Sequence, residues 1–304
     1  MNQATVFGGS GFIGSHVCDK LTEEGYDVII YDCIESSWIK NGQTMFVGDI
    51  LDESLVRKSI EDSDIVYNFA GIADIEEAQN RPMDTIKYNI LGNSIVIEAC
   101  IEKKIKRYVY ASSLYVYSKS GGFYRCSKQA CEQYIEQYNK IFNIDYTILR
   151  YGSLYGPRAG KNNSINRFIR QALKEKKISY EGSKDAIRDY IHVENAARMS
   201  VDILKPEYAN EYIILSGQQS MKVGDLHKMV AEIIGTDIEL DYQSIEYSAH
   251  YETTPYSFNP RFGKKLTSSY YIDLGQGILN IVEELHRQLL PGMVNVDGYL
   301  IDDK

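Results

Sequence analysis

Three side chains in this sequence could together move a proton: Tyr124, Lys128 and Ser113. Tyr124 and Lys128 are four residues apart at the start of a predicted helical stretch, so they lie on one face of it. A tyrosine hydroxyl, with an ordinary pKa near ~10, is a poor base at neutral pH, and a lysine ammonium one turn away would stabilise its phenolate. Ser113 closes a predicted strand, where its hydroxyl could hold a substrate hydroxyl or a developing carbonyl oxygen. The Tyr-x-x-x-Lys spacing alone fits a solvated helix face equally well.

A glycine-rich stretch near the N-terminus supplies the context that the trio needs. Gly8, Gly11 and Gly14 follow an apolar run and precede a helical pattern, which predicts a buried strand, a tight turn and a helix. Such a turn lets the backbone approach a pyrophosphate at the helix N-terminus. Asp32 ends the next predicted strand, where an acid accepts both ribose hydroxyls of NAD and repels the 2′-phosphate of NADP. A glycine turn without a ligand is the alternative, but strand, turn, helix and acid in this order favour an NAD site.

Composition narrows the class of protein. The chain has 304 residues, 44% hydrophobic and 25% charged, as in an ordinary globular protein, and no apolar run reaches membrane-spanning length. A net charge of -9 argues against nucleic acid or an anionic membrane as the main partner. The five cysteines show neither metal-site spacing nor a disulfide framework, which fits a reducing cytoplasm. The first predicted strand begins almost at once, so no signal peptide is expected. We therefore expect a cytoplasmic protein with no metal site.

Strands and helices alternate through the first half of the chain, which predicts an α/β fold with a Rossmann-type, doubly wound parallel sheet. The predicted strands are 3–8, 27–31, 44–47, 64–69, 107–112 and 144–150, and the helices between them are 12–24, 52–60, 81–103 and 125–142. After residue 150 the alternation is lost. The later predicted strands are 178–180, 187–191, 211–215 and 237–241, with helices 163–175, 193–204, 223–234 and 277–289.

This change divides the chain into an NAD-binding part, 1–150, and a smaller mixed α/β region, 151–304. We expect the second part to be partly interleaved with the first, to lie over the carboxyl edge of the sheet and to bind the substrate. Asp52 is a candidate N-cap for the helix 52–60, and Asp49 before it could meet an adenine amino group. The tail from Pro291 to Lys304 has no clear helical pattern and is expected to be loose.

These patterns, taken in order, resemble the extended short-chain dehydrogenase/reductase family, in particular its nucleotide-sugar epimerases and dehydratases. The resemblance covers about residues 3 to 290. Its motifs are the stretches 8–14, 49–50, 68–71, 89–92, 111–117, 124–128 with Glu132, 149–158 and 188–193. The resemblance implies that Tyr124 is the catalytic base, that Lys128 binds the nicotinamide ribose and that Ser113 assists. The cofactor-binding residues that the patterns and the resemblance together indicate are Gly8, Gly11, Phe12, Ile13, Gly14, Asp32, Asp49, Ile50, Phe69, Ala70, Asn89, Tyr124, Lys128 and Tyr151.

For a nucleotide-diphosphate sugar, the resemblance points to Ser113, Ser153, Arg158, Asn163 and Arg188. Arg188, with Arg158, would grip the diphosphate through the planar fork of guanidinium donors. A surface loop charge is the alternative for Arg158, and a simple helix cap is the alternative for Asn163. His192 stands at the end of a buried-looking strand and is interpreted as structural.

The sequence also departs from the family pattern. Sugar 4,6-dehydratases carry Asp-Glu after the catalytic Ser or Thr, whereas this chain has Leu114-Tyr115. Few residues separate Tyr117 from Tyr124, so the sugar site is either wider than usual or closed by another segment. UDP-hexose epimerases typically have Asn at the position of Ser153, and their C-terminal Arg and Asp are replaced here by the stretch 249–252, ahead of Asn259-Pro260. UDP, GDP and other nucleotides therefore all remain open.

Function and assembly follow from the same resemblance. The first expectation is a 4-epimerase that oxidises C4 of the sugar, turns the keto sugar and reduces its other face. The alternatives are a 4-dehydrogenase that stops at the 4-keto sugar, and a non-catalytic NAD-binding sensor. The helices 81–103 and 125–142 carry apolar residues on more than one face, among them Ile86, Ile90, Ile95 and Ile97. In this family the equivalent helices pair across a two-fold axis, which predicts a homodimer unless these residues all belong to the core.

Overall fold

The computed structural model describes residues 2–218, 220–235, 237–243, 250–255 and 264–289. Its centre is an eight-stranded sheet with the order β13-β10-β6-β5-β4-β1-β2-β3, in which every paired strand is parallel to its neighbour. The strands are β1 (Gln3–Phe7), β2 (Asp27–Asp32), β3 (Gln43–Val47), β4 (Ile65–Asn68), β5 (Arg107–Ser113), β6 (Tyr146–Tyr151), β10 (Glu211–Leu215) and β13 (Lys264–Lys265). The predicted doubly wound parallel sheet is confirmed.

The strand order reverses at β1, which pairs with β2 on one side and with β4 on the other. In parallel sheets of this kind the carboxyl ends of the strands meet at one edge, and ligands bind in the crevice at the reversal point. Gly8 follows β1, Phe69 follows β4 and Ser113 ends β5. Residues distant in the sequence therefore come together at this edge.

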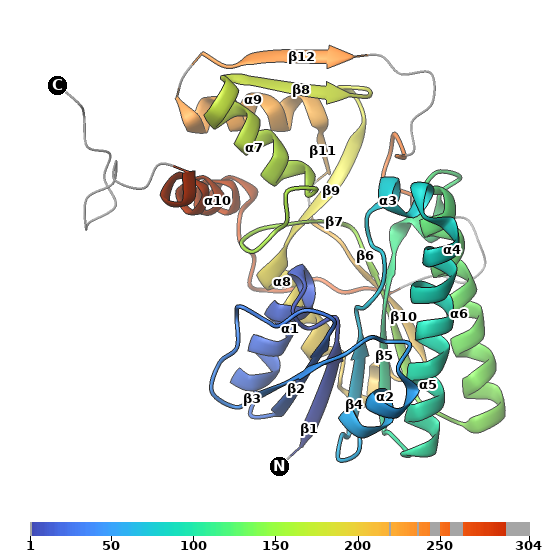
Figure 1. The fold of residues 1–304 in the computed structure, drawn as a ribbon. Coiled ribbons are helices and arrows are strands. Elements are labelled where there is room, and N and C mark those ends of the chain that lie inside the picture. Colours follow the sequence, from blue (N-terminus) through green and yellow to red (C-terminus); the bar gives the residue numbers. More distant parts are fainter. Residues whose placement is uncertain (1, 219, 236, 244–249, 256–263, 290–304) are drawn as a thin grey trace.

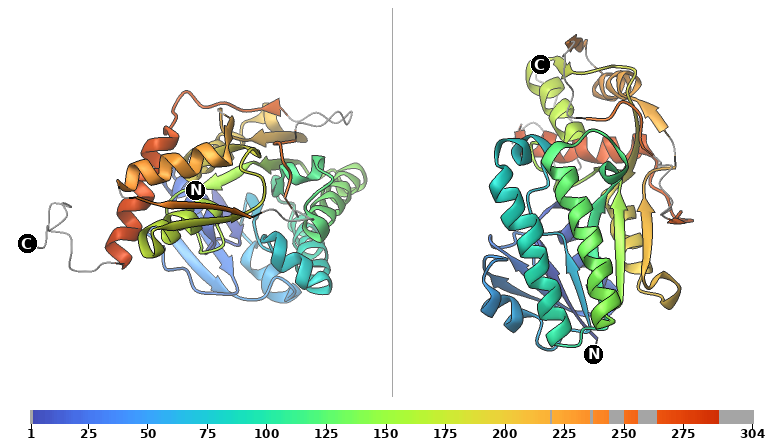
Figure 2. Two further views of the ribbon diagram at one scale, coloured as in Figure 1. Left: turned by 90° about the horizontal axis from the view of Figure 1, so that it is seen from above. Right: turned by 90° about the vertical axis from the view of Figure 1, so that its right-hand side faces the viewer.

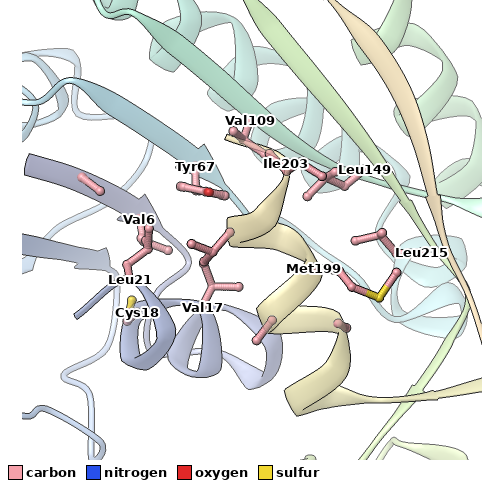
Figure 3. Packing of buried hydrophobic residues seen from close by; sticks show 14 of the residues in the cluster. Val6, Val17, Cys18, Leu21, Tyr67, Val109, Leu149, Met199, Ile203 and Leu215 are labelled. Atoms are coloured by element: carbon pink, nitrogen blue, oxygen red, sulfur yellow. The ribbon is translucent and has the colours of Figure 1, made fainter. Parts of the chain in front are cut away.

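Helices cover both faces of the sheet. The helices α1 (Phe12–Glu23) and α8 (Val193–Asp202) pack on one face, where Val6, Val17, Leu21 and Met199 belong to one apolar cluster (Figure 3). The other face carries α2 (Glu53–Ser59), α5 (Gly92–Glu102) and α6 (Gly122–Phe142), which share a second cluster with the strands. Burial on both faces explains why the strands read as nearly continuous apolar runs.

The predicted helix 81–103 is interrupted: α4 (Pro82–Thr85) runs through a π-helical turn (Ile86–Leu91) into α5. A short helix, α3 (Ile75–Asn80), precedes it, and a 3₁₀ turn (Leu114–Tyr117) follows β5; neither was predicted. Ile95 and Ile97, two of the residues that suggested a dimer interface, are buried in the core, whereas Ile86 is 47% exposed. The side chain of Asp52 caps α2 by accepting a hydrogen bond from the Leu55 N–H, as predicted.

Most of the later chain forms a smaller mixed region above the carboxyl edge of the sheet (Figures 1 and 2). It contains a three-stranded sheet, a two-stranded parallel sheet and three long helices around a third apolar cluster. Its elements are β7 (Ser153–Tyr155), α7 (Ser164–Glu175), β8 (Lys177–Glu181), β9 (Ile187–His192), β11 (Ser220–Lys222), α9 (Val223–Ile234), β12 (Glu239–Gln243) and α10 (Leu274–Leu289). A 3₁₀ turn at Pro206–Tyr208 packs instead on the large sheet, beside β10 and β6. From the same part of the chain, α8 packs on α1 and β10 pairs with β6, so both return to the large sheet.

Most predicted element bounds agree with these within a few residues, and the sequence patterns missed the shortest strands, β7, β11 and β13. The tail predicted to be loose, 291–304, lies outside the described residues. Among the described helices, none combines the length and the apolar character that crossing a membrane requires.

Candidate active site

The glycine turn after β1 is shaped by close backbone packing. Gly8 has a φ of +76°, and a Cβ there would lie 2.7 Å from the Ala70 nitrogen. A Cβ on Gly14 would lie 2.1 Å from the Gly8 oxygen, so α1 can approach the strand only with glycine at this position. Gly11 precedes α1 without any side-chain cap, and Phe12 and Ile13 form the first turn. The first N–H groups of α1 therefore remain to receive an anion, which fits the pyrophosphate of NAD.

Asp32 lies beside this turn at the end of β2. Its carboxylate accepts hydrogen bonds from the backbone N–H of Ser10, at 3.0 Å, and of Ile34, at 3.3 Å. These bonds fix the acid next to the glycine turn, as a ribose contact requires. Asp49 is exposed and accepts from the Leu51 N–H at 2.9 Å, and its contact with adenine remains a prediction.

The loop after β4 is clamped by Asn89. The Asn89 amide accepts from the Ile72 N–H at 2.7 Å and donates to the Ile72 oxygen and to Ser127 Oγ, both at 3.0 Å. This clamp sets the loop that carries Phe69 and Ala70, and it links that loop to α6 one residue before Lys128. Asn89 is 3% exposed, so the structure shows a positioning role for a residue that was predicted to line the cofactor.

Two further predicted cofactor residues direct their side chains into the scaffold. The Tyr151 hydroxyl is 2.6 Å from Ser200 Oγ on α8, within the apolar cluster on that face of the sheet. Ile50 is 7% exposed and packs in the opposite cluster, close to Gly92. The cofactor roles of both residues remain predictions.

The candidate catalytic trio, Ser113, Tyr124 and Lys128, comes together at the end of β5 and the start of α6. The Ser113 hydroxyl lies close enough to Tyr124 to oppose the rise in its pKa. Lys128 Nζ donates to the Ala111 oxygen at 2.7 Å and lies 5.7 Å from the centroid of the Tyr124 ring. The alternative of a solvated helix face is wrong for Lys128, which is 7% exposed.

The pKa of Tyr124 differs from the expectation that Lys128 stabilises its phenolate. Burial raises the pKa of the Tyr124 hydroxyl to about 12, and the nearby Ser113 hydroxyl opposes this rise without cancelling it. Burial also lowers the pKa of the Lys128 ammonium to about 8. The polypeptide alone therefore does not make Tyr124 a ready phenolate, because desolvation of the anion outweighs the stabilising contacts.

Arg150 and Glu132 form a buried ion pair next to the trio, and the sequence patterns gave this pair no role. Arg150 Nε and Nη2 donate to the two Glu132 carboxylate oxygens at 3.0 and 2.7 Å, and Ser112 Oγ donates to Glu132 at 2.6 Å. The pair ties α6 to β5 and β6, one turn beyond Lys128. Glu132 is four residues after Lys128, so a helical-face argument could have found it.

Arg188, on β9, is the cation best placed for an anionic substrate. It is 8% exposed, donates from Nη1 to the backbone oxygens of Ile187 and Glu252, and stacks on the Tyr251 ring at 4.4 Å. Among the residues that the structure describes, no carboxylate forms an ion pair with it. A buried guanidinium without an acidic partner can bind a diphosphate.

Aromatic side chains lie beside Tyr124. A short link, residues 118–123, connects Tyr117 to Tyr124. Arg125 and Gln129 hold this link by donating to the backbone oxygens of residues 116, 118 and 119. Tyr115 meets the Tyr124 ring edge-on at 6.1 Å, and the Tyr251 ring lies 4.6 Å from that of Tyr115. The segment 250–255 thus closes this side of the site. Of the C-terminal motif positions, Ala249 and Asn259-Pro260 lie outside the described residues.

The Arg158 side chain packs against the NAD-binding part of the chain, 1–150. Its Nη2 donates to Asp19 on α1 at 2.7 Å, and its guanidinium stacks on Trp38 at 4.7 Å. The Arg158 side chain is 15% exposed, so it is not a free surface charge. The substrate role remains a prediction, because the described contacts link Arg158 to the loop that follows Asp32.

These contacts give a prediction for Arg158→Ala. Loss of the charged hydrogen bond to Asp19 should lower the free energy of unfolding by about 1–2 kcal/mol, while binding of UDP-glucose stays within about three-fold, less than 1 kcal/mol. Thermal unfolding and calorimetric titration measure the two effects. Weaker binding of UDP-glucose with unchanged stability would instead support the diphosphate role.

The remaining predicted residues lie at helix starts and in β7. Asn163 caps α7 by accepting from the Asn166 N–H, and its amide donates to the Leu154 oxygen at 2.7 Å; its substrate role remains a prediction. His192 caps α8 and is 1% exposed, which confirms its structural interpretation. Ser153 Oγ lies 3.5 Å from the Tyr251 hydroxyl, at the edge of the site.

Comparison with known proteins shows what the whole chain is similar to. A protein of Methanocaldococcus jannaschii that is provisionally assigned as a UDP-glucose 4-epimerase is 29% identical over 298 residues, covering 91% of this chain and 96% of that protein. A dTDP-D-glucose 4,6-dehydratase of Dictyostelium discoideum is 26% identical, covering 69% of this chain and 57% of that protein. Among solved structures, a UDP-glucose 4-epimerase of Thermotoga maritima with UDP-glucose superposes with a TM-score of 0.83 at 24% identity, covering 94% of this chain and 99% of the other.

The family comparison completes the assignment. Residues 4–214 match the model of the NAD dependent epimerase/dehydratase family, a range that contains the glycine turn, the catalytic trio and Arg188. The expected cofactor, NAD, is that of the family, and the glycine turn and Asp32 supply a fitting site for it. The chain belongs to the NAD dependent epimerase/dehydratase family.

Proposed function

We propose that this protein is a nucleotide-sugar 4-epimerase that oxidises and then reduces C4 of the sugar. The observation that carries the proposal is the placement of Ser113, Tyr124 and Lys128 beside the NAD site, with the buried cation of Arg188 facing the same edge. A hydroxyl held between Ser113 and Tyr124 can lose its proton to the tyrosine while Arg188 anchors a diphosphate. The similarity to UDP-sugar enzymes over most of the chain supports this substrate class.

Each residue has a defined task in this reaction. Tyr124 takes the proton of the sugar hydroxyl, Ser113 holds the same oxygen, and Lys128 supports the phenolate and the ribose. NAD, when bound, supplies the hydride acceptor and a positively charged ring that favours the phenolate. Arg188 holds the diphosphate, so that binding energy remote from C4 positions the sugar. Return of the proton by Tyr124, after the sugar has turned, completes the epimerisation without a net change in oxidation state.

Two observations separate this proposal from the reactions of relatives. Elimination of water at C5–C6 would need acidic groups next to Ser113, but Leu114 is fully buried and Tyr115 replaces the second acid. We therefore do not propose a 4,6-dehydratase. A sensor without catalysis would not need Ser113 and Lys128 gathered around Tyr124.

The alternative that stays open is a 4-dehydrogenase that releases the 4-keto sugar, with GDP as one possible nucleotide. A panel of UDP-, GDP-, CDP- and dTDP-hexoses, incubated with NAD-loaded protein, distinguishes these reactions. NMR should show a C4 epimer without net NADH, whereas a dehydrogenase would give stoichiometric NADH absorbance and a 4-keto product. If no sugar in the panel changes, the proposed function is wrong.

The cofactor-bearing fold should assemble as a homodimer through its outer helices. On α6, Phe123, Tyr134 and Ile141 are 45%, 53% and 70% exposed and recur at spacings of eleven and seven residues, which places them on one helical face. The neighbouring helical run exposes Ile86 and Leu91. An apolar surface of this kind on a soluble protein marks an interaction site. Light scattering at micromolar concentration should give twice the mass of one 34.7 kDa chain, and a monomer mass would contradict the prediction.

A further inference from the structure

The ring of Tyr251 lies between the candidate anion site and the catalytic tyrosine. The Arg188 guanidinium stacks on it at 4.4 Å, and the Tyr115 ring contacts it at 4.6 Å with a tilt of 47°. Tyr115 in turn meets Tyr124 edge-on and donates its backbone N–H to Ser113 Oγ at 3.3 Å. A continuous series of contacts therefore connects the cation that would hold a diphosphate with the two groups that would hold the reacting oxygen.

Tyr251 is held firmly by the segment that carries it. The Ile187 N–H donates to the Glu252 oxygen at 2.6 Å, and the Asp189 N–H donates to Thr254 Oγ1 at 3.1 Å. These bonds attach the segment 250–255 to β9 on either side of Arg188. Tyr251 and Thr254 are 6% and 5% exposed. These bonds hold the backbone of the segment against β9, and burial of the ring among its neighbours restricts its rotation.

The contact with Tyr251 leaves the hydrogen-bonding capacity of Arg188 available. The guanidinium carbon lies over the ring at 4.4 Å, and a cation–π contact of this kind uses none of the five N–H donors. One of them, on Nη1, is used by the backbone oxygens of Ile187 and Glu252. Arg188 is therefore held by a ring contact and by two backbone acceptors. A diphosphate would meet the remaining donors of a guanidinium whose position is restricted.

We propose that Tyr251 is a positioning residue that orients Arg188 and sets its separation from Tyr124. It would place the diphosphate so that the attached sugar reaches Tyr124 and Ser113, in a chain whose link before Tyr124 is short. This inference rests on the proposed function, since it concerns the same substrate site. The family resemblance marked the stretch 249–252 only as a departure from the family pattern and gave Tyr251 no role; its contact with Arg188 is visible only in the fold.

Calorimetric titration of NAD-loaded protein with UDP, GDP and UDP-glucose tests the contact directly. Tyr251→Leu should weaken binding of the best of these by about 3- to 30-fold, the range expected from loss of a cation–π contact. Tyr251→Phe, which keeps the ring, should stay within about three-fold, less than 1 kcal/mol. In a double-mutant cycle with Arg188→Ala, Tyr251→Leu should add little further loss, because residues that act through one contact are not additive.

The chain offers a matched control in Tyr270, which stacks on Arg198 at 4.2 Å and is not in contact with Arg188 among the described residues. Tyr270→Leu removes a similar pair and should leave binding unchanged. Equal losses in Tyr251→Leu and Tyr251→Phe would overturn the inference, as would an additive double mutant or an equal loss in Tyr270→Leu. Unfolding curves and NAD affinity of each variant show whether a loss of binding merely reflects misfolding. If Tyr251→Leu does not fold or does not bind NAD, Tyr251→His takes its place in the comparison with Tyr251→Phe and Tyr270→Leu. Histidine keeps a flat ring, so Tyr251→His should bind the nucleotide as Tyr251→Phe does.

Kinetics separate this inference from the proposed function. If the wild type turns over a nucleotide sugar, Tyr251→Leu should raise KM. It should also increase the fraction of enzyme whose bound cofactor remains NADH, because a misplaced keto sugar escapes before reduction. A merely structural role would lower the amount of active enzyme without changing either quantity. If the wild type binds UDP or GDP but converts no sugar, the proposed function is wrong and the binding cycle still decides the role of Tyr251. If it binds none of the probes and converts no sugar of the panel, both are wrong.

Discussion

Tyr124→Phe should lose at least about 10²–10⁴-fold in turnover on the true substrate, the usual contribution of general-base catalysis. The substitution removes one oxygen from a side chain whose ring packs against Tyr115 and lies near Lys128. Because the ring stays in place, the fold and the NAD site should be unaffected. Turnover is measured with the nucleotide sugar found in the panel, and NAD affinity is measured by calorimetry on the same preparation.

The pH dependence of turnover provides an independent check. The reaction needs the phenolate, so turnover should fall as the pH drops below the pKa of Tyr124 in the complete enzyme. Burial raises that pKa to about 12 in the polypeptide, and Tyr124 must therefore gain its charge stabilisation from bound NAD and Lys128. Tyr124→Phe should abolish this limb of the profile. Near-normal turnover by the variant would show that the base has been assigned wrongly.

Serine and lysine variants should differ from this result in an informative way. Ser113→Ala removes a hydrogen bond to the reacting oxygen but leaves the base, so its loss should be smaller than that of Tyr124→Phe. Lys128 is hydrogen-bonded to the Ala111 oxygen as well as lying near Tyr124, so its removal would disturb both the scaffold and the chemistry. For that reason Tyr124→Phe is the cleaner test of the mechanism.

The sequence predicts those parts of the site that depend on spacing along one element. Tyr124 and Lys128 share a helix face, and Gly8, Gly11 and Gly14 share a turn, so their relations follow from helix and turn geometry. The parallel sheet also follows, because alternation of strands and helices leaves few other arrangements.

Contacts between distant segments could not be predicted in the same way. Tyr251 reaches Arg188 across 63 positions of sequence, and Arg158 reaches Asp19 across 139. No local pattern marks either pair, since an isolated tyrosine or arginine reads as an ordinary surface residue. The raised pKa of Tyr124 was missed for a related reason: helix spacing shows which charge is near, but not how much water the surrounding chain excludes.

The second large effect is expected from Gly14→Ala, which should abolish retention of NAD. The added Cβ would lie 2.1 Å from the Gly8 oxygen and 2.9 Å from the Gly8 carbonyl carbon, distances that no side-chain rotation can relieve. The N-terminus of α1 must therefore move away from the end of β1. That movement displaces the first-turn N–H groups that would hold the pyrophosphate, since Gly8 itself is packed against Ala70 on its other side.

The expected magnitude follows from the lost contacts. Overpacking of this kind destabilises a fold by about 1–3 kcal/mol, and each charge-assisted hydrogen bond to the pyrophosphate contributes about 1.5–3 kcal/mol. Loss of even one such bond lowers the affinity for NAD by at least about 10-fold. Calorimetry and the nucleotide content of the purified protein measure this loss. Gly160→Ala is the matched control, because a Cβ there meets nothing within 4 Å, and it should leave NAD affinity unchanged. Equal NAD affinity in Gly14→Ala and the wild type would mean that the cofactor does not lie on the N-terminus of α1.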